Sequence, residues 1–186
     1  VLLKLSGESL MGNNDFGIDL DTINSITDQI SKIRKDGIKL SIVVGGGNTL
    51  NMMAIWKAQG IDVVLKKALE KGIVLAGGSA GSLCWFDNGT TDSRPIELSV
   101  VEGLGFLPYS HSPHYDGEEF RRPLYEKNIK KGIFEAGYAM DNNAGIIFKN
   151  GKPFRVVSLG EEYNCYYVSL KDGKVVEEKL EAEILE

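Results

Sequence analysis

Two short apolar runs that end directly in glycine-rich turns are the strongest constraint on the fold of this chain. Residues 39–44 are rich in β-branched residues and lead into Gly45-Gly46-Gly47, and residues 73–76 lead into the run Gly77–Gly81. Short apolar runs bounded by glycine predict buried strands that end in sharp turns. Helical patterning follows each turn. Alternation of strands and helices predicts an α/β sandwich, a three-layer fold with a mainly parallel sheet.

The chain also opens on a strand and a helix. Residues 1–5 are apolar and predict a strand, and isoleucines spaced three to five residues apart over 18–33 predict one face of an amphipathic helix. With the strand at 39–44 this forms a strand–helix–strand unit, for which a parallel right-handed crossover is expected. Further helical patterns cover residues 49–58, 62–70, 82–86 and 118–131.

The second half of the chain has a different pattern. Residues 87–108 contain many turn residues and predict loops around a short strand near 105–109. Asn150-Gly151 and Asp172-Gly173 then lie between β-rich runs, as in β-hairpins. We therefore expect an antiparallel edge made of C-terminal hairpins.

Length and composition predict a single domain, residues 1–186, because no linker, repeat or low-complexity segment interrupts the chain. The net charge of −5, with both signs interspersed, argues against nucleic acid or an anionic membrane as a partner. The two cysteines form no disulfide framework, and no apolar run or leader pattern indicates a membrane span or signal peptide. We expect a cytoplasmic protein. No cluster of residues has metal-ligand spacing, so neither a metal nor another cofactor is expected.

The run Gly77-Gly78-Ser79-Ala80-Gly81 matches the G-x-S-x-G pattern of serine hydrolases. Its position between a predicted strand and a predicted helix is the context that this chemistry uses. A sharp turn holds the serine in an exposed, strained position, and small neighbours allow the backbone to make that turn. The alternative is a glycine-rich connection without a catalytic role. The sequence context favours Ser79 as a nucleophile.

A serine nucleophile needs a base and usually a group that orients the base. The sequence contains two histidines, His111 and His114, and either could be the base. The candidate carboxylates are Asp92, Asp116 and Asp141, and spacing alone does not choose among them.

Two further features have both a functional and a plain structural interpretation. The turn Gly45–Asn48 could donate backbone N–H groups to an oxyanion or to a phosphate. Together with Lys4 and Gly7, it would suggest a nucleotide site. The alternative is a tight turn without a binding role. Arg121 and Arg122 could clamp a substrate carboxylate, or lie on a solvated helix face.

From about residue 45 onward the sequence resembles the peptidase E family of serine peptidases. Four runs carry the resemblance: GGGNTLNMMAIWKAQGID, VLAGGSAGSLCWFDNGTTDS, GLGFLPYSHSPHYDGEEFRRP and GYAMDNNAGIIF. The resemblance implies a fold similar to class I glutamine amidotransferases. It also implies hydrolysis of short peptides, typically dipeptides with an N-terminal aspartate.

The same resemblance implies roles for individual residues. Ser79 would be the nucleophile, His114 the base and Asp141 the third member of a catalytic triad. Backbone N–H groups of Gly47 and Ala80 would form the oxyanion hole.

Three more assignments follow from it. Asp92 is the alternative acid, His111 is a bystander, and Arg121, or Arg122 beside it, would bind the aspartate side chain of the substrate.

The first 48 residues resemble a different family. VLLKLSGESLMG, FGID and IKLSIVVGGGN are similar to the start of bacterial uridylate kinase. The two resemblances meet at Gly45–Asn48, so the sequence predicts a chimera joined near this turn. Missing peptidase strands would expose a sheet edge, which favours a homo-oligomer.

The sequence thus predicts a serine peptidase with a small peptide as its substrate. The alternatives are a folded but inactive chimera and a nucleotide-binding remnant of a kinase.

Overall fold

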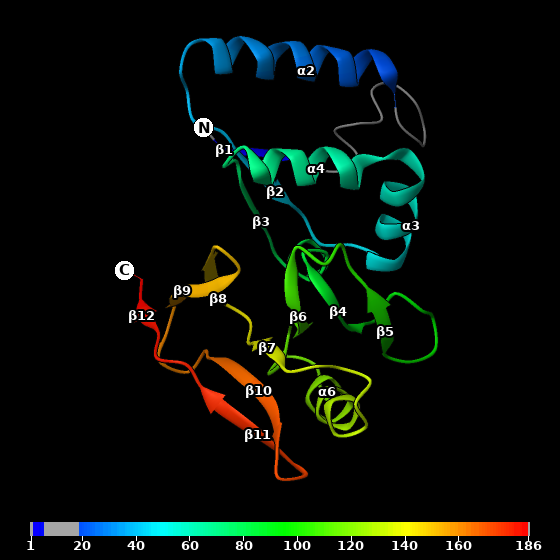
Figure 1. The fold of residues 1–186 in the computed structure, drawn as a ribbon, viewed down its shortest axis with the longest axis vertical. Helices are drawn as coiled ribbons and strands as arrows, with labels where there is room; N and C mark the ends of the chain where they lie inside the picture. The colour runs from blue at the N-terminus through cyan, green and yellow to red at the C-terminus, as the bar shows by residue number, and fades with distance from the viewer. Residues whose placement is uncertain (1, 6–18, 186) are drawn as a thin grey trace.

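The computed structural model of this chain describes residues 2–5 and 19–185 (Figure 1). The N-terminal unit has the predicted order of strand, helix and strand: β1 (Leu2–Leu5), α2 (Leu20–Lys35) and β2 (Ser41–Val44). β1 and β2 are parallel, with Leu3 opposite Ile42.

β2 ends at the first glycine turn. Two helices follow, α3 (Thr49–Gln59) and α4 (Ile61–Glu70), and the chain then returns as β3 (Val74–Gly77). β3 is parallel to β2, which completes a three-stranded sheet in the order β1-β2-β3. Since β2 and β3 are parallel, the two glycine turns that follow them both lie at the carboxyl ends of the strands.

A second sheet has six strands in the order β11-β10-β7-β6-β4-β5. Its middle strands β4, β6 and β7 are parallel, and antiparallel pairs flank them on both sides. The strand bounds are β4 (Phe86–Thr91), β5 (Ser99–Glu102), β6 (Leu107–Ser112), β7 (Gly137–Met140), β10 (Cys165–Lys171) and β11 (Lys174–Lys179).

Two helices and a small third sheet complete the fold. The helices are α5 (Ala80–Leu83) and α6 (Arg121–Lys130), and the sheet contains β8 (Ala144–Lys149), β9 (Lys152–Ser158) and β12 (Glu183–Ile184) in the order β12-β9-β8. Figure 1 places the three-stranded sheet with α2, α3 and α4 at one end of the molecule, and β10, β11 and α6 at the other.

The predicted α/β class, with parallel strands and C-terminal hairpins, is confirmed. Asn150-Gly151 joins β8 to β9, and Asp172-Gly173 joins β10 to β11. The prediction of loops around one short strand over residues 87–108 was wrong, because β4 and β5 lie there. Thr90 and Thr91 in β4 are fully buried, so a strand without an apolar pattern occupies the sheet interior.

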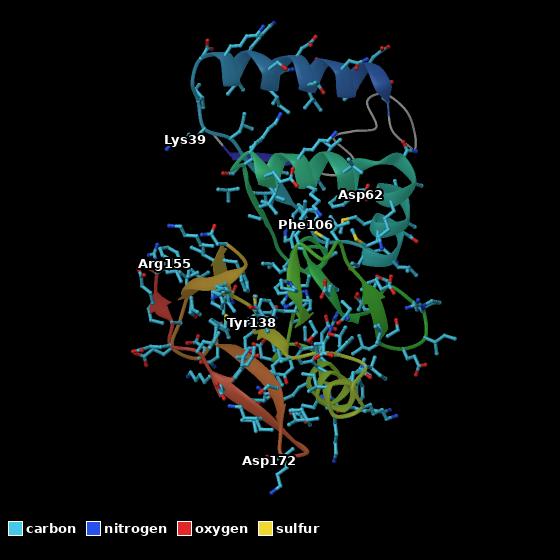
Figure 2. The ribbon with its side chains drawn as sticks, viewed as in Figure 1. Lys39, Asp62, Phe106, Tyr138, Arg155 and Asp172 are labelled. Atoms are coloured by element: carbon cyan, nitrogen blue, oxygen red, sulfur yellow. The ribbon has the colours of Figure 1, made fainter. Side chains whose placement is uncertain are left out.

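Apolar packing joins helices α3 and α4 to the six-stranded sheet. Met53 of α3 and Leu65 of α4 belong to one buried cluster with Trp85, Phe86 and Tyr138. Figure 2 shows Phe106 below α4 and Tyr138 further into the six-stranded sheet. Tyr138 belongs to this cluster and Phe106 packs against it, so the cluster extends from α4 into the sheet. The glycine turns lie at its border. Among the described residues, no helix has the length and apolar character needed to cross a bilayer.

Candidate active site

Ser79 lies on a strained turn between β3 and α5. Its φ of 58° and ψ of −123° lie outside the regions that a serine ordinarily occupies, at a cost of about 1–3 kcal/mol. Gly77 and Gly81 make the turn sterically feasible. A Cβ atom at Gly81 would lie 2.1 Å from the carbonyl oxygen of Val44, and one at Gly77 would lie 2.2 Å from the carbonyl oxygen of Gly81. The glycines of the motif thus let α5 pack against the end of β2 with Ser79 at the apex.

His114 follows β6 and contacts this serine directly. Its Nε2 atom lies 2.9 Å from the Oγ atom of Ser79. Its Nδ1 atom lies 2.6 Å from the amide oxygen of Asn142. An amide oxygen only accepts hydrogen bonds, so Nδ1 carries the proton and Nε2 is left to accept from the serine hydroxyl. This is the tautomer that a general base for Ser79 requires.

The sequence did not point to Asn142 as the residue that contacts Nδ1 of His114. Asn142 follows β7, and its backbone N–H donates to the Oδ1 atom of Asp116 at 2.8 Å, which fixes the segment opposite His114. The available signal was its position next to Asp141, at the end of a strand that pairs with the strand leading to His114. An amide oxygen can orient a catalytic histidine as a carboxylate does, as in Cys-His-Asn proteases.

The structure places the predicted Asp141 one residue away from that role. Its Oδ2 atom accepts from the backbone N–H of Asn164 at 2.9 Å, the residue is 5% exposed, and burial raises the pKa of its carboxyl. Asp141 is buried and Asn142, in the turn that follows β7, is exposed, so the first side chain points inward and the second outward. The alternative acid, Asp92, forms an ion pair with Arg121 at 3.6 Å.

The two candidate arginines are engaged elsewhere in the fold. Arg121 is 2% exposed, donates to Glu118 and to the carbonyl oxygen of Thr90, each at 2.6 Å, and lies near Asp92. Arg122 stacks over two tyrosine rings and lies 3.4 Å from Glu177. The structure brings neither guanidinium to Ser79.

The turn Gly45–Asn48 lies beside Ser79. A Cβ atom at Gly46 would lie 3.4 Å from the Cβ and 3.7 Å from the Oγ atom of Ser79, and Gly47 has a φ of 146°. Asn48 caps α3 and donates from Nδ2 to the carbonyl oxygen of Ser93 at 2.9 Å, which ties the turn to the segment after β4. Ala80 is the first residue of α5, directly after Ser79.

The candidate nucleotide contacts of the N-terminus are not described by the structure. The side chain of Lys4 and the whole of Gly7 lie outside the described residues. Among the residues that are described, no cluster of three or more histidines, cysteines and carboxylates could hold a metal ion.

The second histidine, His111, is linked to the turn at Ser79 through Ser82. His111 is fully buried, and its Nδ1–H donates to the carbonyl oxygen of Tyr138 at 2.8 Å. Its Nε2 atom lies 3.0 Å from the Oγ atom of Ser82, which in turn lies 2.8 Å from the carbonyl oxygen of Ser79. Burial lowers the pKa of His111 to about 4. His111 is therefore neutral near pH 7, and Ser82 links it to the backbone carbonyl oxygen of Ser79.

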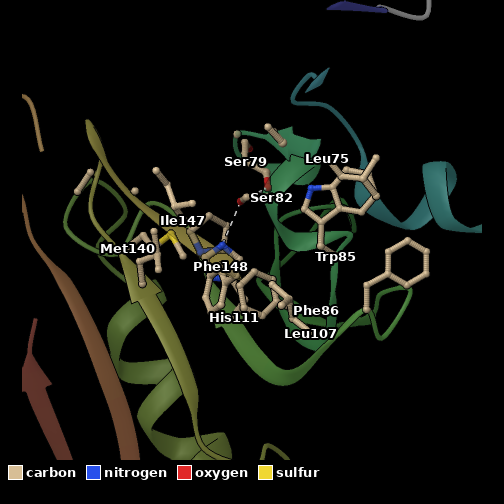
Figure 3. A pocket seen from close by; sticks show the side chains of 18 of the residues that line it. Leu75, Ser79, Ser82, Trp85, Phe86, Leu107, His111, Met140, Ile147 and Phe148 are labelled. Carbon is tan, nitrogen blue, oxygen red and sulfur yellow. Dashed lines mark hydrogen bonds between the residues drawn. The ribbon is translucent and has the colours of Figure 1, made fainter. Parts of the chain in front are cut away.

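A cleft of about 640 Å³ opens beside Ser79 and His114. Figure 3 shows Leu75 and Trp85 on one side of Ser79, and Met140, Ile147 and Phe148 on the other. Ser79 and His114 therefore face a largely apolar cavity of the size that small-molecule and peptide ligands occupy.

Comparison with known proteins shows the family of this chain. The sequence matches peptidase family S51 over residues 9–156. This chain belongs to peptidase family S51. The match confirms the resemblance to the peptidase E family, and it begins within the range that resembles uridylate kinase.

The curated proteins similar to this S51 family member include the following two. One is the uncharacterized peptidase YgaJ of Bacillus subtilis, 43% identical over 136 residues, which cover 73% of this chain and 59% of that protein. The other is a uridylate kinase of Marinobacter nauticus, 34% identical over 140 residues, which cover 74% of this chain and 52% of the kinase. The chain thus spans between half and three fifths of the length of these relatives.

Proposed function

We propose that this chain is a serine peptidase that cleaves short peptides through an acyl-enzyme, with Ser79 as the nucleophile and His114 as the base. One observation carries the proposal: the 2.9 Å contact between the Ser79 hydroxyl and the Nε2 atom of His114, on a strained strand-to-helix turn. Family S51 membership is independent support.

The contacts support a two-step mechanism. The Oγ atom of Ser79 attacks the peptide carbonyl carbon as its proton passes to Nε2 of His114. The imidazolium keeps its Nδ1–H on the amide oxygen of Asn142, 2.6 Å away. His114 then gives its proton to the amine leaving group as the C–N bond breaks. Water, deprotonated by His114, attacks the acyl carbon, the ester bond to Ser79 breaks to release the acid product, and His114 returns the proton to the Oγ atom of Ser79.

The oxyanion of each tetrahedral intermediate needs donors on the far side of Ser79. We assign them to the backbone N–H groups of Ala80 and Gly47. The closeness of Gly46 to the Ser79 side chain supports this assignment, because it puts the glycine turn within van der Waals distance of the nucleophile. Each such donor contributes about 3 kcal/mol to stabilisation of the transition state.

The preference for N-terminal aspartate remains a prediction from the resemblance. It requires Arg121 or Arg122 to bind a substrate carboxylate, and both guanidinium groups already pair with acidic side chains. Asp92, as the acid of a triad, has the same difficulty, because it pairs with Arg121.

Nucleotide binding is a second candidate because of the similarity to uridylate kinase. Thermal stabilisation by UMP or ATP at millimolar concentration would support it. The position of the Gly45–Asn48 turn beside Ser79 favours the oxyanion role over a phosphate site.

The peptidase proposal is tested by hydrolysis of a panel of dipeptides and small esters, including Asp-X dipeptides. The parent chain is compared with Ser79→Ala and with Ser25→Ala, an exposed serine on α2. We expect Ser79→Ala to abolish turnover and Ser25→Ala to leave it unchanged. Equal rates for the parent and Ser79→Ala, or no turnover by the parent, as an inactive chimera would give, contradict the proposal.

A further inference from the structure

The cleft beside Ser79 is built from apolar side chains on both walls. Leu75 and Trp85 lie on one side, and Ile147 and Phe148 on the other (Figure 3). Ile147 is 45% exposed, so an apolar surface faces solvent next to the nucleophile. Covering this surface with an apolar side chain of a ligand is favourable by the hydrophobic effect.

The charges around the cleft disfavour an acidic ligand. Among the described residues that line it, none is a lysine or arginine, and Asp141 is the one carboxylate. A substrate aspartate placed here would lose water without gaining a cation, and it would add a second negative charge beside Asp141. The lining therefore matches aromatic or aliphatic side chains.

Two strand edges border the cleft. Among the described strands, β3 pairs with β2 and β8 pairs with β9, so each has an edge without a strand partner. Residues of both strands line the cleft, and Val74 of β3 is 60% exposed. A free edge offers backbone N–H and C=O groups to an extended peptide. β3 leads directly into the turn that carries Ser79, so a peptide paired with it is directed toward the nucleophile.

We infer that the substrates of this site are extended peptides with a large apolar side chain next to the cleaved bond. The peptide backbone lies along the free edge of β3, and the apolar side chain enters the cleft between Leu75 and Ile147. The inference rests on the proposed function, since cleavage requires Ser79. Burial of a phenylalanine or leucine side chain corresponds to an affinity gain of about 10- to 100-fold over a residue left in water.

Binding can be measured without turnover in the Ser79→Ala variant. The sequence contains two tryptophans, so adding Trp56→Phe leaves Trp85, in the cleft lining, as the fluorescent reporter. The probes are the capped tripeptides Ala-Phe-Ala and Ala-Asp-Ala. We expect the phenylalanine peptide to bind at least 10-fold more tightly. Equal affinities, or tighter binding of the aspartate peptide, overturn the inference.

A matched pair of variants locates the binding surface. Ile147→Asp puts a charge on the cleft wall, and Ile133→Asp does the same at an exposed isoleucine outside the cleft, 51% exposed. We expect Ile147→Asp to weaken binding of the phenylalanine peptide at least 10-fold and Ile133→Asp to leave it unchanged. An equal effect of the two variants overturns the inference. The inference is also overturned if the parent chain is a dimer that does not bind the peptide and that Ile147→Asp dissociates.

The inference and the proposed function can fail separately. Modification of Ser79 by a fluorophosphonate, together with preferential cleavage of aspartate peptides, overturns the inference and leaves the serine peptidase intact. If the phenylalanine peptide binds specifically but the fluorophosphonate does not modify Ser79, the result supports an apolar ligand in the cleft and contradicts the serine mechanism.

Discussion

The amide oxygen of Asn142 lies 2.6 Å from the Nδ1 atom of His114, on the side of the imidazole opposite Ser79. A neutral amide therefore holds the place that a carboxylate has in a Ser-His-Asp triad. It fixes the tautomer of His114 without placing a negative charge beside the imidazole.

Substitutions at the two adjacent positions separate the candidate roles of Asn142 and Asp141. Asn142→Ala removes the acceptor for His114, and we expect kcat to fall about a hundredfold with little change in KM. Asn142→Asp keeps an acceptor oxygen and should retain activity within about tenfold of the parent.

The companion substitution is Asp141→Asn, which preserves an acceptor for the backbone N–H of Asn164. We expect its kcat to stay within about threefold of the parent. A loss at Asp141→Asn that exceeds the loss at Asn142→Ala would show that Asp141 orients the base, as the sequence predicted. Steady-state kinetics on one ester substrate decide between the two.

Alanine at three glycines tests the packing of the nucleophile turn. At Gly81 a Cβ atom would lie 2.1 Å from the carbonyl oxygen of Val44, so Gly81→Ala should destabilise the fold by about 3 kcal/mol. At Gly46 the nearest contact is the Ser79 Cβ atom at 3.4 Å, so Gly46→Ala should lower kcat/KM at least tenfold with little loss of stability.

Gly45→Ala is the control, since no heavy atom lies within 4 Å of the added Cβ. Urea unfolding and ester hydrolysis are measured for all three variants. A Gly46→Ala enzyme with parental activity would place the turn away from the reacting atoms and would remove the support for Gly47 as an oxyanion donor.

Much of the fold could be predicted from the sequence, because its signals are local. Strands such as β2 and β3 are apolar runs that end in glycine, and Asn150-Gly151 specifies a hairpin. β4 was missed because it is stabilised by long-range pairing: Gly89 packs so closely against His111 that a Cβ atom would lie 1.9 Å from its carbonyl oxygen. A contact of this kind leaves no periodic pattern in the sequence.

The part of the candidate site that has local sequence signals was also predictable. The G-x-S-x-G motif is local, and with two histidines in the chain the choice of base was narrow. The choice between Asp141 and Asn142 depends on which side chain turns outward after β7, and sequence spacing does not encode that direction. The engagement of Arg121 with Glu118 and Thr90 is likewise a tertiary contact.

Arg121 is expected to act on stability. Arg121→Met leaves the carbonyl oxygen of Thr90 and the side chain of Glu118 without their donor, and we expect the free energy of unfolding to fall by about 3 kcal/mol. Arg122→Met, at a half-exposed side chain, should cost about 1 kcal/mol. An Arg121 variant with parental stability and a selective loss of Asp-X hydrolysis would restore its role as the substrate clamp.

The buried His111 makes stability depend on pH. Burial lowers its pKa from 6.5 to about 4, so the unfolded chain binds a proton that the folded chain excludes. The contribution of neutral His111 is complete above the unfolded pKa and is lost as the pH falls through the folded pKa. Over this range it amounts to about 3 kcal/mol.

Denaturant unfolding at a series of pH values checks this, with His111→Gln as the reference. The raised pKa of Asp141 acts in the opposite direction and cancels in the difference between the two proteins. The parent should lose more stability than His111→Gln as the pH falls from about 7 to about 4. Parallel pH profiles of the two proteins would contradict the assignment of a buried neutral imidazole.

We propose that His114 activates Ser79 for attack, and the test is intact-protein mass spectrometry after treatment with a fluorophosphonate. We expect one adduct per chain, located on Ser79, absent in Ser79→Ala and formed at least about 100-fold more slowly in His114→Gln. An unmodified parent chain, or a parent and a His114→Gln variant that react at the same rate, would contradict it.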